Sequence, residues 1–189
     1  DYRLTELEHS QHMAQGALEE LPEGRAWLLV QFNGDDVDDA AGSAEAMVDH
    51  LRRDGLTQNA KVIRDPADQK RVWAAREGGL GATAHPPGGP DTHPGWEDAA
   101  VPPDRVGDYL RDFGELLDRF GYQGASQYGH FGHGCIHTRI PFDLKSAAGI
   151  QRFREFVTAA AHLVTEYGGS LSGEHGDGQA RGELLSIMF

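Results

Sequence analysis

The stretch Tyr128-Gly-His-Phe-Gly-His-Gly-Cys-Ile-His-Thr-Arg-Ile140 predicts a β-hairpin that carries histidines at the centre of the fold. Side chains alternate between the faces of a strand, so His137 and Arg139 share one face. A two-residue turn at positions 133–134 would place His130 directly opposite His137, with β-carbons about 5 Å apart. Two imidazoles at that separation could bind one metal ion. The alternative is a set of surface histidines in a flexible turn.

A second glycine-dense stretch, Gly168-Gly-Ser-Leu-Ser-Gly-Glu-His-Gly-Asp-Gly178, supplies candidate partners for these histidines. Glu174 would complete a two-histidine, one-carboxylate metal site, which leaves positions open for a substrate. His175 would then point elsewhere and suits a general base beside that substrate. Asp177 is expected to cap the following helix rather than to orient His175. The alternative is an acidic turn ahead of a helix; the glycine spacing does not fit a phosphate loop.

Size and composition predict one globular domain. The chain has 189 residues, 39% of them hydrophobic and 25% charged, which is typical of a folded protein. A net charge of −13 argues against nucleic-acid binding, which needs clustered cations. No apolar run approaches the roughly 18 residues of a membrane span. A lone Cys135 excludes an internal disulfide, so we expect a cytoplasmic protein with no membrane span, or one attached to a membrane through an electron-transfer partner.

The order of predicted elements indicates an α+β fold. Residues 1–24 are expected to be a lead-in helix or a linker from a missing N-terminal domain, and residues 25–189 one substrate domain truncated at its C-terminus. Strands are predicted at 26–32, 61–64 and 97–101 and on both sides of the hairpin turn. Helices are predicted after Asp36, Asp65 and Pro102, and across residues 150–164. This order predicts a ferredoxin-like layer, an antiparallel sheet with helices on one face.

Two arginines are candidates for holding a carboxylate substrate. An arginine binds a carboxylate with two parallel hydrogen bonds. Arg76 is the first candidate, and Arg139 is the second because it shares the predicted face with His137. A surface ion pair with an acidic neighbour is the alternative for either one.

Four segments together resemble a known family. Residues 73–77, 97–102, 129–137 and 168–178 resemble, in the same order, the C-terminal substrate domain of FAD-linked oxidases of the vanillyl-alcohol-oxidase superfamily. The similarity is to D-lactate, glycolate and D-2-hydroxyglutarate dehydrogenases, and the phrase Gly-Cys-Ile-His-Thr-Arg139 resembles members that also carry an iron–sulfur region. The resemblance implies a ferredoxin-like cap that takes part in oxidising a D-2-hydroxy acid to a 2-oxo acid.

The resemblance also implies roles for individual residues. His130, His137 and Glu174 match the family's ligands for a divalent metal, zinc or manganese. His175 matches the proposed catalytic base, and Arg76 matches the arginine that holds the substrate carboxylate. FAD would be bound mainly by a missing N-terminal domain of the same protein, and an iron–sulfur cluster would lie elsewhere in it. The electron acceptor is not implied.

Departures from the family pattern concern the substrate. His133 and Cys135 stand where the common motif has Asp and Asn, Arg139 stands where relatives often carry Asn, and Trp96 occupies about the place of a lysine. We expect the chain alone to bind no FAD and to be inactive. Two further functions stay open: a flavin-independent metal hydrolase that uses the same histidines and carboxylate, and a non-catalytic ferredoxin-like regulatory domain.

Overall fold

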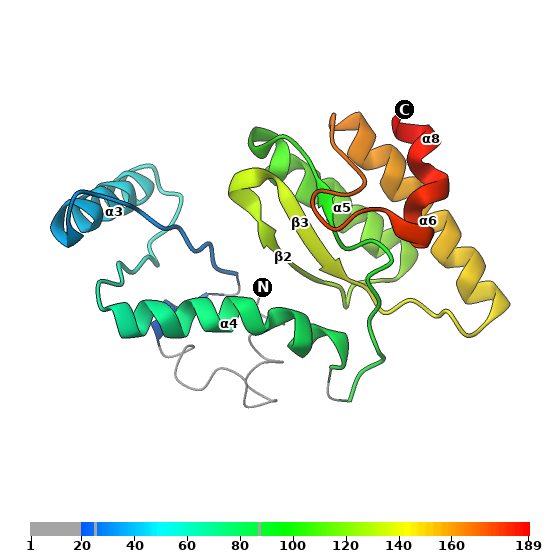
Figure 1. The fold of residues 1–189 in the computed structure, drawn as a ribbon, viewed down its shortest axis with the longest axis horizontal. Helices are drawn as coiled ribbons and strands as arrows, with labels where there is room; N and C mark the ends of the chain where they lie inside the picture. Colours follow the sequence, from blue (N-terminus) through cyan, green and yellow to red (C-terminus); the bar gives the residue numbers. More distant parts are fainter. Residues whose placement is uncertain (1–19, 25, 87) are drawn as a thin grey trace. The chain divides into compact units, whose positions relative to one another are not determined.

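The computed structural model describes residues 20–24, 26–86 and 88–189. The chain divides into two compact units, which meet in sequence between Ala82 and Thr83 (Figure 1). Residues 1–19 of the expected lead-in lie outside the described residues. The assignment of residues 25–189 to one substrate domain stays a prediction. Within the described ranges, no helix has the length and apolarity that crossing a bilayer requires.

Two helices of the first unit begin where the sequence predicts. In α3 (Val37–Arg53), the Asp36 carboxylate accepts a hydrogen bond from the N–H three residues later, at 2.9 Å. The chain leaves this helix through Gly55, whose φ of 71° suits a residue without a β-carbon. In α4 (Pro66–Ala84), the Asp65 carboxylate accepts the first two free N–H groups at 2.8 and 3.1 Å. Local capping therefore determines both helix starts.

The strands expected at residues 26–32 and 61–64 are wrong. Neither segment is a strand in the described part of the first unit. Leu28 and Val30, apolar residues of the first segment, are 69% and 46% exposed. In the later segment, the backbone carbonyl of Ile63 accepts a hydrogen bond from the side chain of Gln69 at 2.8 Å. A strand needs a partner strand for its backbone groups, and the described residues of this unit supply none.

The second unit contains an antiparallel sheet of β1 (Ala99–Ala100), β2 (Ser126–His130) and β3 (Cys135–Arg139) in the order β1-β3-β2. Ser170 continues the sheet beyond β1 as a single antiparallel bridge to Ala100. The chain thus follows the β-α-β-β-α-β path of a ferredoxin-like unit, with its last strand reduced to this bridge. The predicted α+β class is confirmed.

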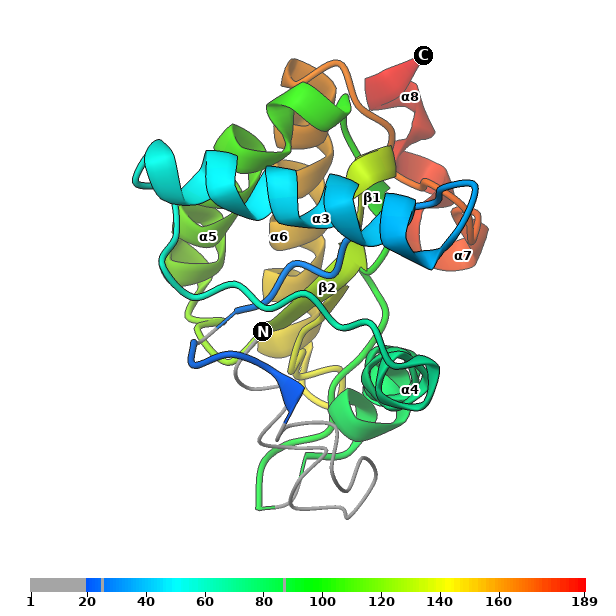
Figure 2. The same cartoon turned by 90° about the vertical axis from the view of Figure 1, so that its left-hand side faces the viewer.

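Two long helices cover one face of this sheet. Figures 1 and 2 show α5 (Val106–Phe120) and α6 (Ala147–Glu166) side by side on the same side of the strands. Between helices and sheet lies an apolar core that includes Phe156 and Ile136. Gly121, with φ 79°, ends α5 as predicted. The shorter elements are Pro103–Arg105, Phe131–His133 and Gly182–Leu184, which are 3-10 helices, and α7 (Gly178–Arg181) and α8 (Leu185–Met188).

Removing the ring of Phe156 tests this core. Phe156 is 0% exposed, and the rings of Phe113, Phe120, Tyr122 and Phe142 surround it at centroid distances of 5.2–6.2 Å. Phe156→Ala should lower the free energy of unfolding by about 3–5 kcal/mol, measured by urea denaturation. Ile150→Ala, at a half-exposed position of the same helix, should change it by about 0.5 kcal/mol. Equal losses in both variants would contradict the assigned core.

Candidate functional site

The face of the sheet away from the helices carries the hairpin histidines, but the predicted register is wrong. His137 lies opposite Tyr128, and His130 lies opposite Cys135. A two-residue turn was expected, whereas a 3-10 turn at residues 131–133 and the following glycine, with φ 75°, connect the strands. The register therefore shifts by two residues. His130 and His137 become diagonal neighbours on one face, with ring centroids 5.7 Å apart.

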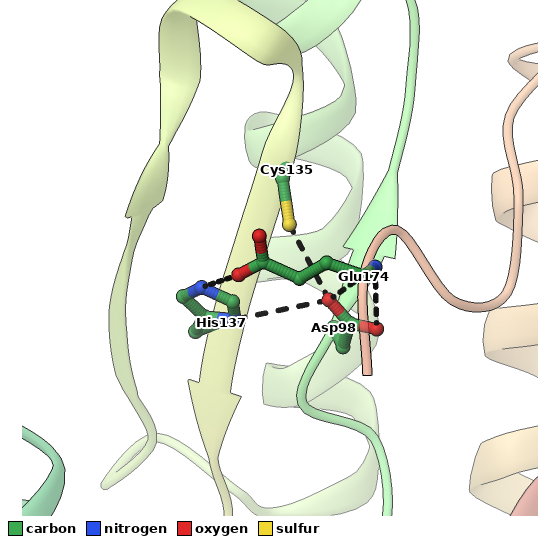
Figure 3. Close-up of side chains that lie close together, drawn as sticks. All are labelled: Asp98, Cys135, His137 and Glu174. Carbon is green, nitrogen blue, oxygen red and sulfur yellow. Dashed lines mark hydrogen bonds and ion pairs between the residues drawn. The ribbon is translucent and has the colours of Figure 1, made fainter. Parts of the chain in front are cut away.

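The loop at residues 171–176 brings Glu174 and His175 onto the same face. Glu174 Oε1 lies 3.0 Å from His137 Nε2, 3.4 Å from His175 Nε2 and 3.7 Å from His130 Nε2. The rings of His137 and His175 stack, with centroids 5.0 Å apart. Figure 3 shows Glu174 reaching from its loop across to His137 on β3. Three imidazole nitrogens thus converge on one carboxylate oxygen, from segments far apart in the sequence.

Glu97 orients two of these histidines. Its carboxylate Oε1 lies 2.6 Å from His175 Nδ1, and its backbone carbonyl lies 3.1 Å from His137 Nδ1. When each Nδ1 donates to an oxygen of Glu97, each Nε2 is left free to accept a proton or bind a cation. The hydrogen bond with Glu97 raises the pKa of His175 above its ordinary value, and burial opposes this. Glu97 therefore favours a His175 that takes up a proton readily.

Asp98 holds the loop that carries Glu174 and His175. Its carboxylate is 0% exposed and accepts hydrogen bonds from the backbone N–H groups of Glu174 at 3.1 Å and His175 at 2.8 Å, and from Ser172 Oγ at 2.5 Å. Burial alone would raise the pKa of Asp98. The hydrogen bonds from Ser172, His175, Glu174 and the Cys135 thiol outweigh burial and lower the pKa to about 2. Asp98 is thus a buried anion at neutral pH, stabilised by the loop itself.

The donor chemistry fits a divalent metal. The site contains two groups of possible ligands, and within each group the donor atoms lie within 4.8 Å of one another. The first group comprises Asp98, Cys135, His137 and Glu174, and the second comprises Glu97, His137 and His175. Burial raises the pKa of the metal-free Cys135 thiol to about 12, and this thiol donates a hydrogen bond to Asp98 at 3.4 Å. His137 belongs to both groups and its Nε2 lies 3.0 Å from Glu174 Oε1, so these two residues are the best-placed ligands. His130, in neither group, could join through its 3.7 Å approach to Glu174. Imidazole and carboxylate ligands suit zinc or manganese.

Other predicted residues are placed as follows. Arg139 lies two residues after His137 on the same face of β3, and its Nε is buried without a hydrogen-bond partner in the described chain. Arg76 lies on α4 in the first unit, and its role stays a prediction. His133 is exposed at the turn. Trp96 is 1% exposed and belongs to the apolar core.

The expectation for Asp177 is wrong. Its side chain makes no capping hydrogen bond to α7, and the capping position has helical rather than extended dihedral angles, with φ −83° and ψ −31°. The carboxylate that lies at hydrogen-bond distance from His175 Nδ1 is instead that of Glu97, a residue that the sequence did not single out. Two adjacent acids at the start of an apolar strand were the available signal, because acidic side chains are rarely buried without partners.

Removing the charge of Asp98 should have an effect that depends on pH. The folded-state pKa of about 2 lies below the ordinary 3.8. The ionised carboxylate therefore stabilises the fold above about pH 4 by roughly 2 kcal/mol, and this contribution is lost as the pH falls toward 2. Asp98→Asn should be less stable than the wild type near pH 6, and urea denaturation should show the gap narrowing toward low pH. Asp118→Asn, at an exposed position of α5, controls for the loss of one carboxylate; a gap that is independent of pH would contradict the role of Asp98.

A family model and several relatives match most of this chain. Residues 5–188 match the family of FAD linked oxidases, C-terminal domain. The chain is 34% identical over 166 residues to a D-2-hydroxyglutarate dehydrogenase of Pseudomonas putida, covering 85% of this chain and 16% of the relative. It is 31% identical over 170 residues to the Escherichia coli protein of that name, with the same coverage. A glycolate oxidase subunit GlcD of Escherichia coli is 28% identical over 167 residues, 88% of this chain and 32% of the relative.

These matches cover most of the chain but only part of each relative. The chain spans about a sixth of the length of the D-2-hydroxyglutarate dehydrogenases it matches. The segments that form the site, from Glu97 to His175, all lie within the family match. On the extent of that match and the identity to these relatives, the chain belongs to the family of FAD linked oxidases, C-terminal domain.

Proposed function

We propose that the chain is the substrate- and metal-binding portion of a flavin-dependent dehydrogenase that oxidises a D-2-hydroxy acid to a 2-oxo acid. The observation that carries the proposal is the approach of three imidazole Nε2 atoms to within 3.0–3.7 Å of Glu174 Oε1. The names of the relatives, D-2-hydroxyglutarate dehydrogenase and glycolate oxidase subunit, support the substrate class. FAD would be held mainly by another domain of the same protein.

Residues of this chain would hold and orient the substrate. His130, His137 and Glu174 would bind a divalent cation, zinc or manganese. Arg139 has a buried Nε that lacks a partner among the described residues, so a substrate carboxylate could satisfy it. Arg76 stays the arginine that the family resemblance proposes for the substrate carboxylate. When bound, FAD would accept the α-hydrogen of the substrate together with its two bonding electrons, and the cation would act as a Lewis acid that lowers the pKa of the substrate hydroxyl.

His175 would act as the general base. Nδ1 of His175 lies 2.6 Å from the Glu97 carboxylate and would donate to it, so Nε2 is the nitrogen that can take up a proton. His175 would accept the hydroxyl proton at Nε2, and Glu97 would stabilise the imidazolium that forms. The hydroxy acid becomes the oxo acid when it loses that proton from its hydroxyl and a hydride, the α-hydrogen with its two bonding electrons, from its α-carbon.

The direct test uses the full-length protein that contains this chain. Its flavin is mixed anaerobically with D- and L-2-hydroxy acids, with and without a chelator, and the bleaching of flavin absorbance is followed. We expect bleaching by D-2-hydroxy acids and a slower reaction after chelation. Hydrolysis by the metal-loaded protein in the absence of flavin would instead favour a metal hydrolase, and failure of every hydroxy acid would overturn the proposal.

Substitutions separate the base from the metal ligands. His175→Ala should slow flavin reduction roughly 10²–10⁴-fold while leaving bound metal unchanged, because only proton transfer is lost. Glu174→Gln should lower the metal content, measured by mass spectrometry of the purified protein. His133→Ala, exposed at the hairpin turn, is the control and should change neither property. Loss of metal from His175→Ala with turnover retained would reverse the two assignments.

Arg139 has its own test. Arg139→Met should raise the KM for the hydroxy acid by roughly tenfold or more, because a charge-assisted hydrogen bond to the substrate carboxylate is lost. Arg139→Lys should recover part of the affinity, since it keeps the charge without the planar fork. Steady-state kinetics of the full-length protein measure both. An unchanged KM in the Met variant would exclude Arg139 from the substrate site.

A further inference from the structure

A second buried charge, in addition to that of Asp98, contacts the loop that carries Glu174 and His175. Arg181, on α7, is 3% exposed. Its Nη1 donates to the carbonyl oxygen of Leu171 at 3.0 Å, and its Nη2 donates to that of Gly176 at 2.7 Å. One guanidinium thus bridges the first and last residues of the loop at 171–176.

No described carboxylate makes an ion pair with Arg181 within 4.0 Å, although other arginines of the chain do so, such as Arg154 with Glu183. Burying a guanidinium away from water is unfavourable unless its N–H groups are satisfied. The loop carbonyls meet that need, so the cation stays in place only while the two ends of the loop keep their present separation. An apolar side chain could fill this space but could not donate to the two carbonyls.

The loop is therefore held by two side chains of opposite charge: an anion binds its backbone N–H groups, and a cation binds its backbone carbonyl groups. Asp98 accepts from the N–H groups of Glu174 and His175, and Arg181 donates to carbonyls at both ends. Inside the loop, Ser172 Oγ accepts the N–H of Gly176 at 2.7 Å. Side chains from outside the loop thus bind both its N–H and its C=O groups. Few backbone conformations satisfy all of these hydrogen bonds at once.

We propose that Arg181 is a positioning residue that sets where Glu174 and His175 stand over β3, without itself touching the substrate. The role rests on the proposed function, because it matters for catalysis only if Glu174 binds metal and His175 accepts a proton. Residues behind the ligands of a metal site commonly contribute to affinity in this way.

Backbone amide hydrogen exchange of the full-length protein tests the positioning without any ligand. In Arg181→Met, exchange should rise by roughly tenfold or more for the peptide that covers residues 171–176, while amides of β2 and β3 change little. Arg181→Lys, which keeps one charge but cannot reach both carbonyls, should lie between the wild type and the Met variant. Arg154→Met, at an exposed arginine of α6 paired with Glu183, is the matched control and should match the wild type.

Zinc affinity gives a second readout that a general loss of stability would not reproduce. Titration of metal-free protein with Zn²⁺ against a chromophoric chelator should show affinity lowered roughly 10- to 100-fold in Arg181→Met and unchanged in Arg154→Met. Exchange that rises equally in the loop, β2 and β3 would show a merely structural role and overturn the proposal. Unchanged exchange in the loop would also overturn it. If the wild type binds no Zn²⁺, the metal part of the proposed function fails, and the exchange comparison alone decides the role of Arg181.

Discussion

The site depends on the contact between the buried carboxylate of Asp98 and the backbone N–H groups of the loop at residues 171–176. A buried carboxylate is unfavourable without hydrogen-bond donors, and loop N–H groups at this depth are equally unfavourable without acceptors. Each therefore requires the other, although 76 or 77 residues separate them in the sequence. Satisfying both places Glu174 and His175 over β3, so the geometry of the site follows from satisfying buried backbone groups.

The shared face of the histidines could be predicted from the sequence, even with the wrong register. Side chains alternate along a strand, so a shift of two residues keeps His130 and His137 on one face, whereas a shift of one would have separated them. The helix ends at Asp36, Asp65 and Gly121 were also predictable. Their hydrogen bonds or backbone angles involve residues only a few positions away.

The strand assignments in the first unit and the roles of Glu97 and Asp98 could not be predicted, because they depend on residues far away in the sequence. The apolar segments 26–32 and 61–64 have strand-like composition, but composition does not supply the neighbouring strand that a ladder requires. Likewise, no residue near Glu97 or Asp98 in the sequence indicates the loop whose groups form hydrogen bonds with their carboxylates. Their role follows from the fold, in which the bridge between Ala100 and Ser170 holds the start of the loop beside β1.

The charges of the site also bear on the proposed metal. Carboxylate oxygens of Asp98 and Glu174 lie within 4.8 Å of each other, and the carboxylate of Glu97 lies as close to His137 and His175. Like charges at such separations repel, the more so where water is excluded. Asp98 accepts hydrogen bonds from the loop and from the Cys135 thiol. Among the described residues, the side chain of Glu174 makes its ion pairs with His130, His137 and His175. A divalent cation between Glu174 and the imidazoles would turn that repulsion into attraction, which gives a physical reason for these donors to converge on one point.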